Sequence, residues 1–315
     1  MAFAQEKSNA YFVNAKEFLR TDSLNLALIE LDSATKLAPD FSEAYFFKAQ
    51  IWEKKNKLRK AIGQYSLAIL HNPKLVAAYL SRAALHYKLK DHRNYVLNDI
   101  NKAISLQPNN DELYQLKAYY YASTLSPKDL KPDFENAIIT INSAIAINPN
   151  KPEYYKLRSD YKLRNDQKLS ALLDINKAIE MSEAEDQYYH HRSIIRFSMS
   201  DFRSALNDIN KAIELEDSLS EYYQLRGNVY YNLKKYNQAY NSYTSAINLL
   251  FKKIVEHKAK LKPGSPLNIK LRQTLLLRGM ALVQENKPFD GCGDFNKALQ
   301  MGESKANNYI RQYCR

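Results

Sequence analysis

The chain has 315 residues, of which 45% are hydrophobic and 25% are charged, and this composition excludes an intrinsically disordered protein. Only 7 residues are glycine and 10 are proline, against 24 tyrosines, so the composition disfavours a β-rich fold or a glycine-rich phosphate loop and favours packed helices. The formal charge is +12, and the sequence has no apolar run of about eighteen residues, the pattern of a membrane-spanning helix.

The first seven residues, MAFAQEK, contain the triplet Ala2-Phe3-Ala4 followed by Gln5, which has the A-x-A form of a signal-peptide cleavage site. The charged and apolar regions that precede such a site are missing. Two interpretations stand: the triplet is fortuitous, or residues 1–7 are the flexible remnant of a signal-peptide end. We expect the second, which predicts export to the periplasm or cell envelope of a bacterium rather than a cytoplasmic protein.

A six-residue phrase, DINKAI, occurs at Asp99–Ile104, Asp174–Ile179 and Asp208–Ile213, with a looser copy, DFNKAL, at 294–299. Its alanine belongs to a row that recurs at spacings of 34, 35, 41, 34, 34, 34 and 52 residues. This row comprises Ala34, Ala68, Ala103, Ala144, Ala178, Ala212, Ala246 and Ala298. A second row comprises Ala15, Ala49, Ala83, Ala118, Ser159, Ser193, Gly227 and Gly279. Small side chains let helices approach closely, so one close approach is predicted in every unit.

Within each unit the apolar spacing predicts two helices of about a dozen residues and a short turn. Four units end in a proline, and seven carry a tyrosine early in the first helix. In period, small-residue rows, tyrosine row and terminal proline, the chain resembles tetratricopeptide repeat proteins. The resemblance implies an all-α fold, a right-handed α-solenoid (superhelix) of stacked antiparallel helix pairs. The expected units are approximately 8–41, 42–75, 76–110, 111–151, 152–185, 186–219, 220–253 and 272–303, with a C-terminal capping helix at 304–315.

The aspartate of the repeated phrase accompanies an arginine in the first helix of the same unit. The two residues are sixteen or seventeen positions apart, where antiparallel helices face each other. The predicted pairs are Arg82 with Asp99, Arg158 with Asp174, Arg192 with Asp208, and Arg278 with Asp294. We interpret them as structural ion pairs rather than as a ladder of catalytic acids.

In the family that the chain resembles, first helices line a concave groove that holds a peptide or a helix of a partner. The resemblance implies an apolar wall in the first three units and a mostly polar wall in units four to seven. The alternative is that the aromatic residues of this set are covered by adjacent units. The expected groove residues are Phe12, Lys16, Phe46, Phe47, Gln50, Leu80, Gln115, Tyr119, Lys156, Asp160, His190, Ile194, Gln224 and Asn228.

Two insertions interrupt the repeat, near 125–133 and 252–270. In the first, Asp133 is a candidate helix N-cap. In the second, the stretch from Phe251 to Arg272 holds seven Lys and Arg residues and one acid, so it carries half of the net charge. Its basic patch consists of Lys252, Lys253, Lys258, Lys260 and Lys262. The insertion is either a contact for an anionic partner or a solvated basic helix.

The two cysteines, Cys292 and Cys314, lie at equal distances on either side of Glu303. If the capping helix folds back at the turn before it, the two side chains come together, and a disulfide is predicted. Such a bond supports export, because it persists only in an oxidising compartment. The alternative is two thiols that never meet.

No nucleophile elbow, HExxH motif or cluster of metal ligands is present, and the adjacent His190 and His191 point about 100° apart on a helix. We therefore expect no enzyme activity, no cofactor and no metal site. The predicted function is a protein-interaction scaffold that binds a peptide or helix of another protein, of unknown identity. The alternative is binding of nucleic acid or an anionic surface through the Lys-rich insertion 252–272, although the groove lacks a continuous cationic and aromatic stripe.

Overall fold

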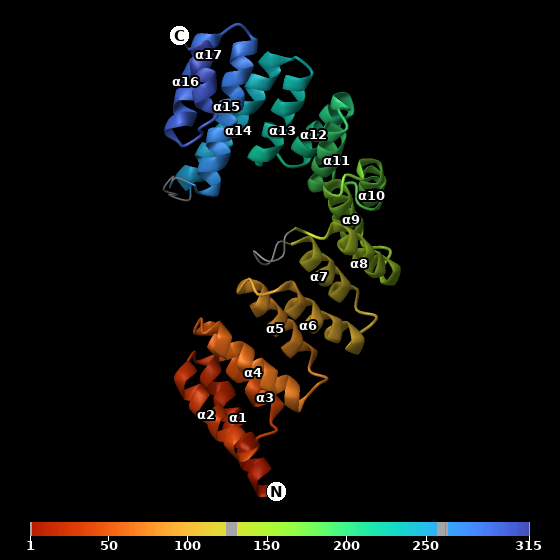
Figure 1. The fold of residues 1–315 in the computed structure, drawn as a ribbon, viewed down its shortest axis with the longest axis vertical. Helices are drawn as coiled ribbons and strands as arrows, with labels where there is room; N and C mark the ends of the chain where they lie inside the picture. The colour runs from red at the N-terminus through yellow and green to blue at the C-terminus, as the bar shows by residue number, and fades with distance from the viewer. Residues whose placement is uncertain (1, 124–130, 257–261, 263, 315) are drawn as a thin grey trace. The chain divides into compact units, whose positions relative to one another are not determined.

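A computed structural model describes residues 2–123, 131–256, 262 and 264–314. The described residues form seventeen α-helices and no strand (Figure 1). They divide into two compact units, Met1–Pro149 and Asn150–Arg315, which we call unit 1 and unit 2. No described helix combines the length and the apolarity needed to cross a membrane.

Unit 1 contains four helix pairs, each consisting of a first helix and a second helix that pack against each other. The pairs are α1 (Ala2–Arg20) with α2 (Leu24–Leu37), α3 (Ser42–Lys54) with α4 (Leu58–His71), α5 (Val76–Lys88) with α6 (Arg93–Leu106), and α7 (Asp111–Ala122) with α8 (Phe134–Ile147). Each second helix also packs against the first helix that follows it within the unit, so the pairs stack in sequence. Stacking covers the apolar face that a single pair would leave exposed.

Unit 2 repeats this arrangement four times and ends with a single helix. The pairs are α9 (Pro152–Arg164) with α10 (Lys168–Met181), α11 (Asp186–Ser198) with α12 (Phe202–Leu215), α13 (Ser220–Asn232) with α14 (Tyr236–Glu256), and α15 (Pro266–Gln284) with α16 (Pro288–Gln300). The last helix, α17 (Ala306–Tyr313), packs on α16 as the capping helix. The fold is an α-solenoid of stacked antiparallel helix pairs, as the sequence predicts.

The small-residue rows form the contact between paired helices. All eight alanines of the row from Ala34 to Ala298 are fully buried. Where this contact is closest, even a methyl group does not fit: a Cβ on Gly227 would lie 2.4 Å from the Tyr243 ring, and a Cβ on Gly279 would lie 2.6 Å from the Phe295 ring. Glycine at these two positions therefore makes room for an aromatic ring on the second helix.

The turns inside the pairs share a left-handed backbone conformation that the sequence does not predict. Among the residues that the structure describes, seven other than glycine have positive φ, each just after a first helix: Asp22, Asn56, Lys90, Asp166, Ser200, Lys234 and Asn286. The following N–H bonds back to a carbonyl in the last turn, as Lys57 does to Trp52 at 2.8 Å. This is the Schellman arrangement, in which glycine is the commonest residue at the left-handed position. Here the chain builds it without glycine.

Two element boundaries differ from the sequence prediction. Residues 2–7, expected to be flexible, belong to α1, because Ala, Gln, Glu and Lys favour helix and neither glycine nor proline interrupts them. The second insertion lengthens both neighbouring helices: α14 continues to Glu256, in agreement with a basic helix at the start of this insertion, whereas α15 begins at Pro266 instead of near 272. Of the first insertion, residues 125–130 lie outside the described residues, and Asp133 caps α8 by accepting the Asn136 N–H at 3.0 Å.

Candidate functional site

Successive first helices touch each other through side chains, and we call the surface they form in each unit its first-helix face. In unit 1, the rings of Phe12 on α1 and Phe47 on α3 lie 5.3 Å apart, and the hydroxyls of Tyr87 on α5 and Tyr119 on α7 lie 3.0 Å apart. In unit 2, the rings of His190 on α11 and Tyr222 on α13 lie 4.5 Å apart. Each face is thus built from several first helices.

At the start of the unit 1 face, aromatic rings pack on one another beneath a lysine. Phe12 is only 9% exposed, because it lies between Phe41 at 4.8 Å and Phe47 at 5.3 Å. The ammonium of Lys16 stands 4.4 Å from the Phe12 ring. Phe46 is half-buried, 5.4 Å from the Tyr65 ring. Phe12 therefore forms the floor of the face, whereas Lys16 is exposed on it.

Farther along unit 1, three tyrosines form a more open cluster. Tyr119 is 46% exposed, and its ring lies 6.0 Å from Tyr87 and 5.6 Å from Tyr120. Tyr87 was not among the predicted groove residues, although it lies seven residues, about two helical turns, after Leu80, which was. The remaining predicted residues of this face are Gln50, which is exposed, and Leu80 and Gln115, which are half-buried.

The unit 2 face is polar, and several of its side chains hydrogen-bond to one another. His191 is buried, and its Nε2 lies 3.2 Å from the Oγ of Ser159 on the preceding first helix. Burial lowers the pKa of His190 and of His191 to about 4, so both rings are neutral at neutral pH. Tyr222 donates a hydrogen bond to Asp186 beside His190. The two histidines face different helices, and the described residues contain no group of three His, Cys, Asp or Glu side chains arranged to hold a metal ion.

The other predicted residues of unit 2 lie on the same face and are half-buried. Asn228 is not free to bind a partner, because its Oδ1 accepts a hydrogen bond from the Tyr243 hydroxyl at 2.9 Å. Asp160 pairs with Arg164 at 3.0 Å. The remaining half-buried members are Lys156, Ile194 and Gln224.

The four predicted arginine and aspartate pairs are in contact. In each, two guanidinium nitrogens donate to the two carboxylate oxygens, with shortest distances of 2.6 Å for Arg82–Asp99, 2.6 Å for Arg158–Asp174, 2.8 Å for Arg192–Asp208 and 2.7 Å for Arg278–Asp294. The aspartate side chains are 4% to 8% exposed. The hydrogen bond to Asp99 raises the pKa of Arg82 above its ordinary value, as expected for a paired guanidinium.

These arginines also reach the preceding helix pair, which the sequence pattern does not reveal. Arg82 donates to Ser66 at 2.8 Å, and Arg192 donates to Asn176 at 2.9 Å. Lys48, which has no aspartate in its own pair, instead binds Asp32 of the pair before it at 2.5 Å. Arg82, Arg192 and Lys48 therefore each join two consecutive pairs, and these contacts help to fix how those pairs stack.

The second insertion exposes both charge and apolar surface at the end of α14. Lys252 and Lys262 are exposed and Lys253 is half-buried, while Lys258 and Lys260 lie outside the described residues. Lys252 lies 3.9 Å from Glu256, and Lys270 lies 3.7 Å from Glu221 of α13. Part of the positive charge is therefore matched by nearby acids.

A disulfide joins Cys292 of α16 to Cys314, the residue that follows α17, with the two Cα atoms 5.7 Å apart. The capping helix is thus attached covalently to the last helix pair.

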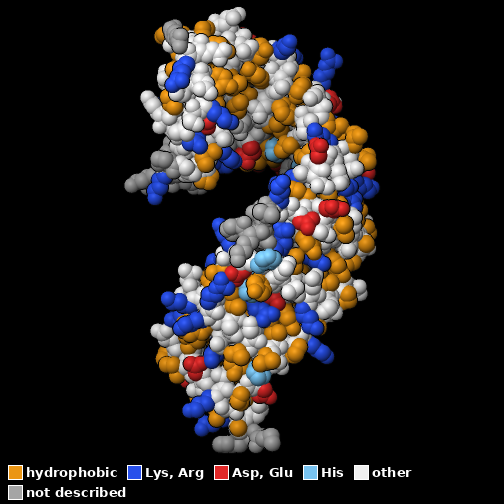
Figure 2. All heavy atoms as spheres, viewed as in Figure 1, with side chains coloured by type: hydrophobic (Ala, Val, Ile, Leu, Met, Phe, Trp, Pro, Cys, Tyr) orange, Lys and Arg blue, Asp and Glu red, His pale blue; other side chains and the backbone are white. Residues whose placement is uncertain are grey.

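Figure 2 shows one face of the molecule, on which the described Lys and Arg side chains are dispersed among hydrophobic and neutral ones.

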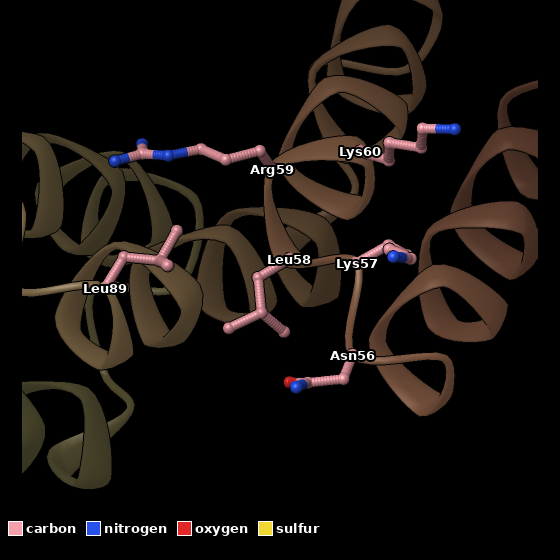
Figure 3. A pocket seen from close by; sticks show the side chains of 6 residues that line it. All are labelled: Asn56, Lys57, Leu58, Arg59, Lys60 and Leu89. Atoms are coloured by element: carbon pink, nitrogen blue, oxygen red, sulfur yellow. The ribbon is translucent and has the colours of Figure 1, made fainter.

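A surface hollow of about 420 Å³ lies where α4 begins, beside the end of α5. Leu58 and Leu89 border it, and Arg59 extends from it toward α5 while Lys60 points the other way (Figure 3). Arg59 is bound to Asp91 at 2.6 and 2.8 Å, so the basic groups here do not converge on a ligand.

No protein-family model matches the chain. A UDP-N-acetylglucosamine–peptide N-acetylglucosaminyltransferase of Giardia intestinalis is 33% identical over 92 residues, which are 29% of this chain and 6% of that enzyme. The chain therefore spans a small fraction of this curated relative.

Two solved structures resemble the chain over most of its length. The C-terminal part of a TPR repeat-containing protein from Cytophaga hutchinsonii has a TM-score of 0.61 and 14% identity, and covers 84% of this chain and 99% of its own. A tetratricopeptide repeat protein from Parabacteroides merdae has a TM-score of 0.56 and 16% identity, and covers 86% and 99%. The chain therefore has the fold of tetratricopeptide repeat proteins.

Proposed function

We propose that the protein is a non-catalytic interaction scaffold, and that the first-helix face of unit 1 binds an extended or helical segment of another protein. The observation that carries this proposal is the tyrosine cluster of α5 and α7. Tyr119 is 46% exposed although its hydroxyl is already bound to Tyr87, so its ring offers apolar surface to a partner. Tyrosines that combine ring surface with a polar edge are enriched where proteins bind each other.

The same face also carries a positive charge near its beginning. Lys16 stands over Phe12 and Phe47 and is exposed, so a partner segment gains by placing an acidic group there. Between Lys16 and Tyr119 the face presents small or neutral side chains, among them Ala84 and Gln50, both exposed. The partner that fits is a segment with aromatic or aliphatic side chains and an acidic residue at one end.

The absence of catalysis is part of the proposal, and the state of the buried acids supports it. Asp99, Asp174, Asp208 and Asp294 each accept two or more hydrogen bonds from arginine, so none is poised as a general acid or base. His191 Nε2 lies 3.2 Å from the Ser159 hydroxyl, but Ser159 is fully buried and its Oγ also donates to the Ala171 carbonyl at 2.7 Å, so this pair is closed to a substrate.

A second candidate function is contact with nucleic acid or an anionic surface through the insertion 252–272. It is favoured by exposed Lys252 next to the exposed apolar side chains of Phe251 and Val255, which are 42% and 75% exposed. The acids Glu256 and Glu221 weaken it, because they lie near Lys252 and Lys270. Binding of this kind falls steeply with salt, whereas binding on apolar tyrosine surface does not.

We also propose that the protein works in an oxidising compartment outside the cytosol, such as the bacterial periplasm or cell envelope. The disulfide between Cys292 and Cys314 supports this, because cytosolic thiols are kept reduced. Alkylation of free thiols in intact producing cells, followed by mass spectrometry, tests it. Two alkylated cysteines in the native compartment would contradict the proposal.

The experiment for the main proposal is selection of peptides from a random library on the oxidised full chain, followed by fluorescence polarisation. We expect selected peptides to lose about tenfold in affinity on Tyr119→Ala, the loss of one aromatic anchor. Tyr114→Ala is the matched control, because Tyr114 lies on the same helix with its hydroxyl bound to the Pro108 carbonyl at 3.0 Å. A labelled single-stranded RNA at two salt concentrations forms the second arm. Salt-sensitive RNA binding without any peptide binding would replace the proposal by the alternative.

A further inference from the structure

Unit 2 contains a cavity of about 90 Å³ at the end of its first-helix face. Its walls come from four helices: Tyr231 of α13, Met280, Val283 and the polar Gln284 of α15, Phe295 of α16, and Tyr309 and Tyr313 of α17. Met280 and Tyr231 both lie on first helices, and Tyr231 lies about one helical turn after Asn228, a predicted groove residue. The cavity is therefore bordered by residues of two first helices, α13 and α15, together with α16 and α17.

The size and lining of the cavity restrict what it can hold. Sites for drug-sized ligands measure about 300–1,000 Å³, and a cavity that holds benzene measures about 150 Å³, so about 90 Å³ suits a single aliphatic side chain. The lining named above has no charged residue. Burial, with the neighbouring Tyr236, Tyr309 and Tyr313, raises the pKa of Tyr231, so its hydroxyl stays neutral at physiological pH. A charged group entering the cavity would lose its hydration without a partner of opposite charge.

One wall of the cavity depends on a helix that cannot hold its shape alone. Helix α17 has only eight residues, and isolated helices of fewer than about twelve are marginal in water. It is held by the burial of Ala306, by stacking of Tyr309 on Phe295 at 5.3 Å, and by the disulfide at its end. Of these three attachments, the disulfide lies nearest to Tyr313, the last residue of α17 that lines the cavity. Cys314 follows Tyr313 directly, and Cys292 Sγ lies 3.7 Å from the Tyr313 carbonyl oxygen.

We propose that this cavity of unit 2 binds one aliphatic side chain, such as leucine, of the partner protein, and that the disulfide between Cys292 and Cys314 keeps the cavity formed. This inference rests on the proposed function, because it adds a separate contact in unit 2 to the segment of the same partner that binds unit 1. A dithiol reductant would convert the disulfide to two thiols, supplying two electrons and two protons, and would itself become a disulfide. The last turn of α17 would then be free to leave, and Tyr313 would no longer close the cavity.

The test uses the oxidised full chain with ¹³C-labelled methionine methyl groups and N-acetyl-leucine N-methylamide as the probe. We expect a saturable shift of the Met280 methyl resonance, while the methyl groups of Met181 and Met199 on other helices stay in place. The alanine analogue should bind about tenfold more weakly because it fills less of the cavity, and the tryptophan analogue should cause no saturable shift. No shift at Met280, or equal shifts at all methionines, would overturn the proposal.

The role of the disulfide is tested by the same titration on Cys314→Ser and on the wild-type chain reduced with dithiothreitol. We expect about tenfold weaker binding of the leucine probe in both, with circular dichroism showing that the array remains folded. Tyr114→Ala in unit 1 is the control and should bind the probe as the wild type does. Unchanged affinity after reduction would overturn the role of the disulfide.

Failure here can be told apart from failure of the proposed function. If selected peptides bind in a Tyr119-dependent manner while the leucine probe never shifts Met280, only the subsite is wrong. If neither peptides nor probe bind, both proposals fail.

Discussion

The two units share one backbone pattern but present different first-helix faces. In unit 1, aromatic rings meet across helices, with Tyr119 left 46% exposed. In unit 2, the corresponding contacts are made by Ser159 with His191 and by His190 with Tyr222, and Asn228 is tied to Tyr243. The small-residue rows set how the paired helices pack in both units, whereas the residues of the first-helix faces differ between the units. The repeat therefore determines the architecture, and the variation between units determines where a partner can bind.

The largest expected effect concerns the ion pairs, which both units share. Asp208 accepts hydrogen bonds from Arg192 and Arg196, and its side chain is 4% exposed. Asp208→Ala should cost about 3–5 kcal/mol of unfolding free energy, because two guanidinium groups lose their buried partner. Urea unfolding measures this loss of unfolding free energy. Glu214→Ala, which breaks the exposed pair with Lys211, should cost no more than about 1 kcal/mol. Equal losses for the two variants would mean that the ladder is not structural.

Removal of the disulfide should affect the stability of the two units differently, because both of its cysteines lie in unit 2. Its cysteines are 22 residues apart, so Cys292→Ser with Cys314→Ser should lower the unfolding free energy of unit 2 by about 3 kcal/mol. Hydrogen exchange followed by proteolysis and mass spectrometry assigns the loss to a unit. Dithiothreitol should reproduce the effect in the wild type. A loss spread equally over both units would contradict this account.

Acid should destabilise unit 2 through its buried histidine, His191. The pKa of His191 is lowered to about 4 by burial, with further lowering by Lys156, His190 and Arg164 and opposition from Asp160. Between pH 6.5 and 4 the unfolded chain binds the proton and the folded chain does not, so stability is full above pH 6.5 and falls as the pH drops. We expect a loss of about 1–3 kcal/mol over this range, measured by urea unfolding. His191→Gln should flatten the dependence, and an unchanged slope would show that this histidine is not responsible.

Much of the fold follows from the sequence because side-chain size recurs with the helix pair. The buried alanine row and the arginine and aspartate spacing depend only on which positions of two paired helices face each other. The Schellman turns could not be predicted in the same way, since the chain places Asn56 or Lys90 where glycine is usual. The burial of Phe12 depends on how Phe41 and Phe47 pack against it, and the spacing of residues along the repeat does not specify this packing. Nor does a periodic row reveal the pairing of Tyr87 with Tyr119 or the cavity beneath α17.

The most direct test of the difference between the units compares one face residue from each in peptide binding. Tyr119→Ala in unit 1 and Gln224→Ala in unit 2 are measured with the same selected peptide by fluorescence polarisation on the oxidised chain. The account predicts about tenfold weaker binding for Tyr119→Ala and less than about twofold for Gln224→Ala. Equal losses, or a larger loss for Gln224→Ala, would contradict the assignment of the partner site to the aromatic face of unit 1.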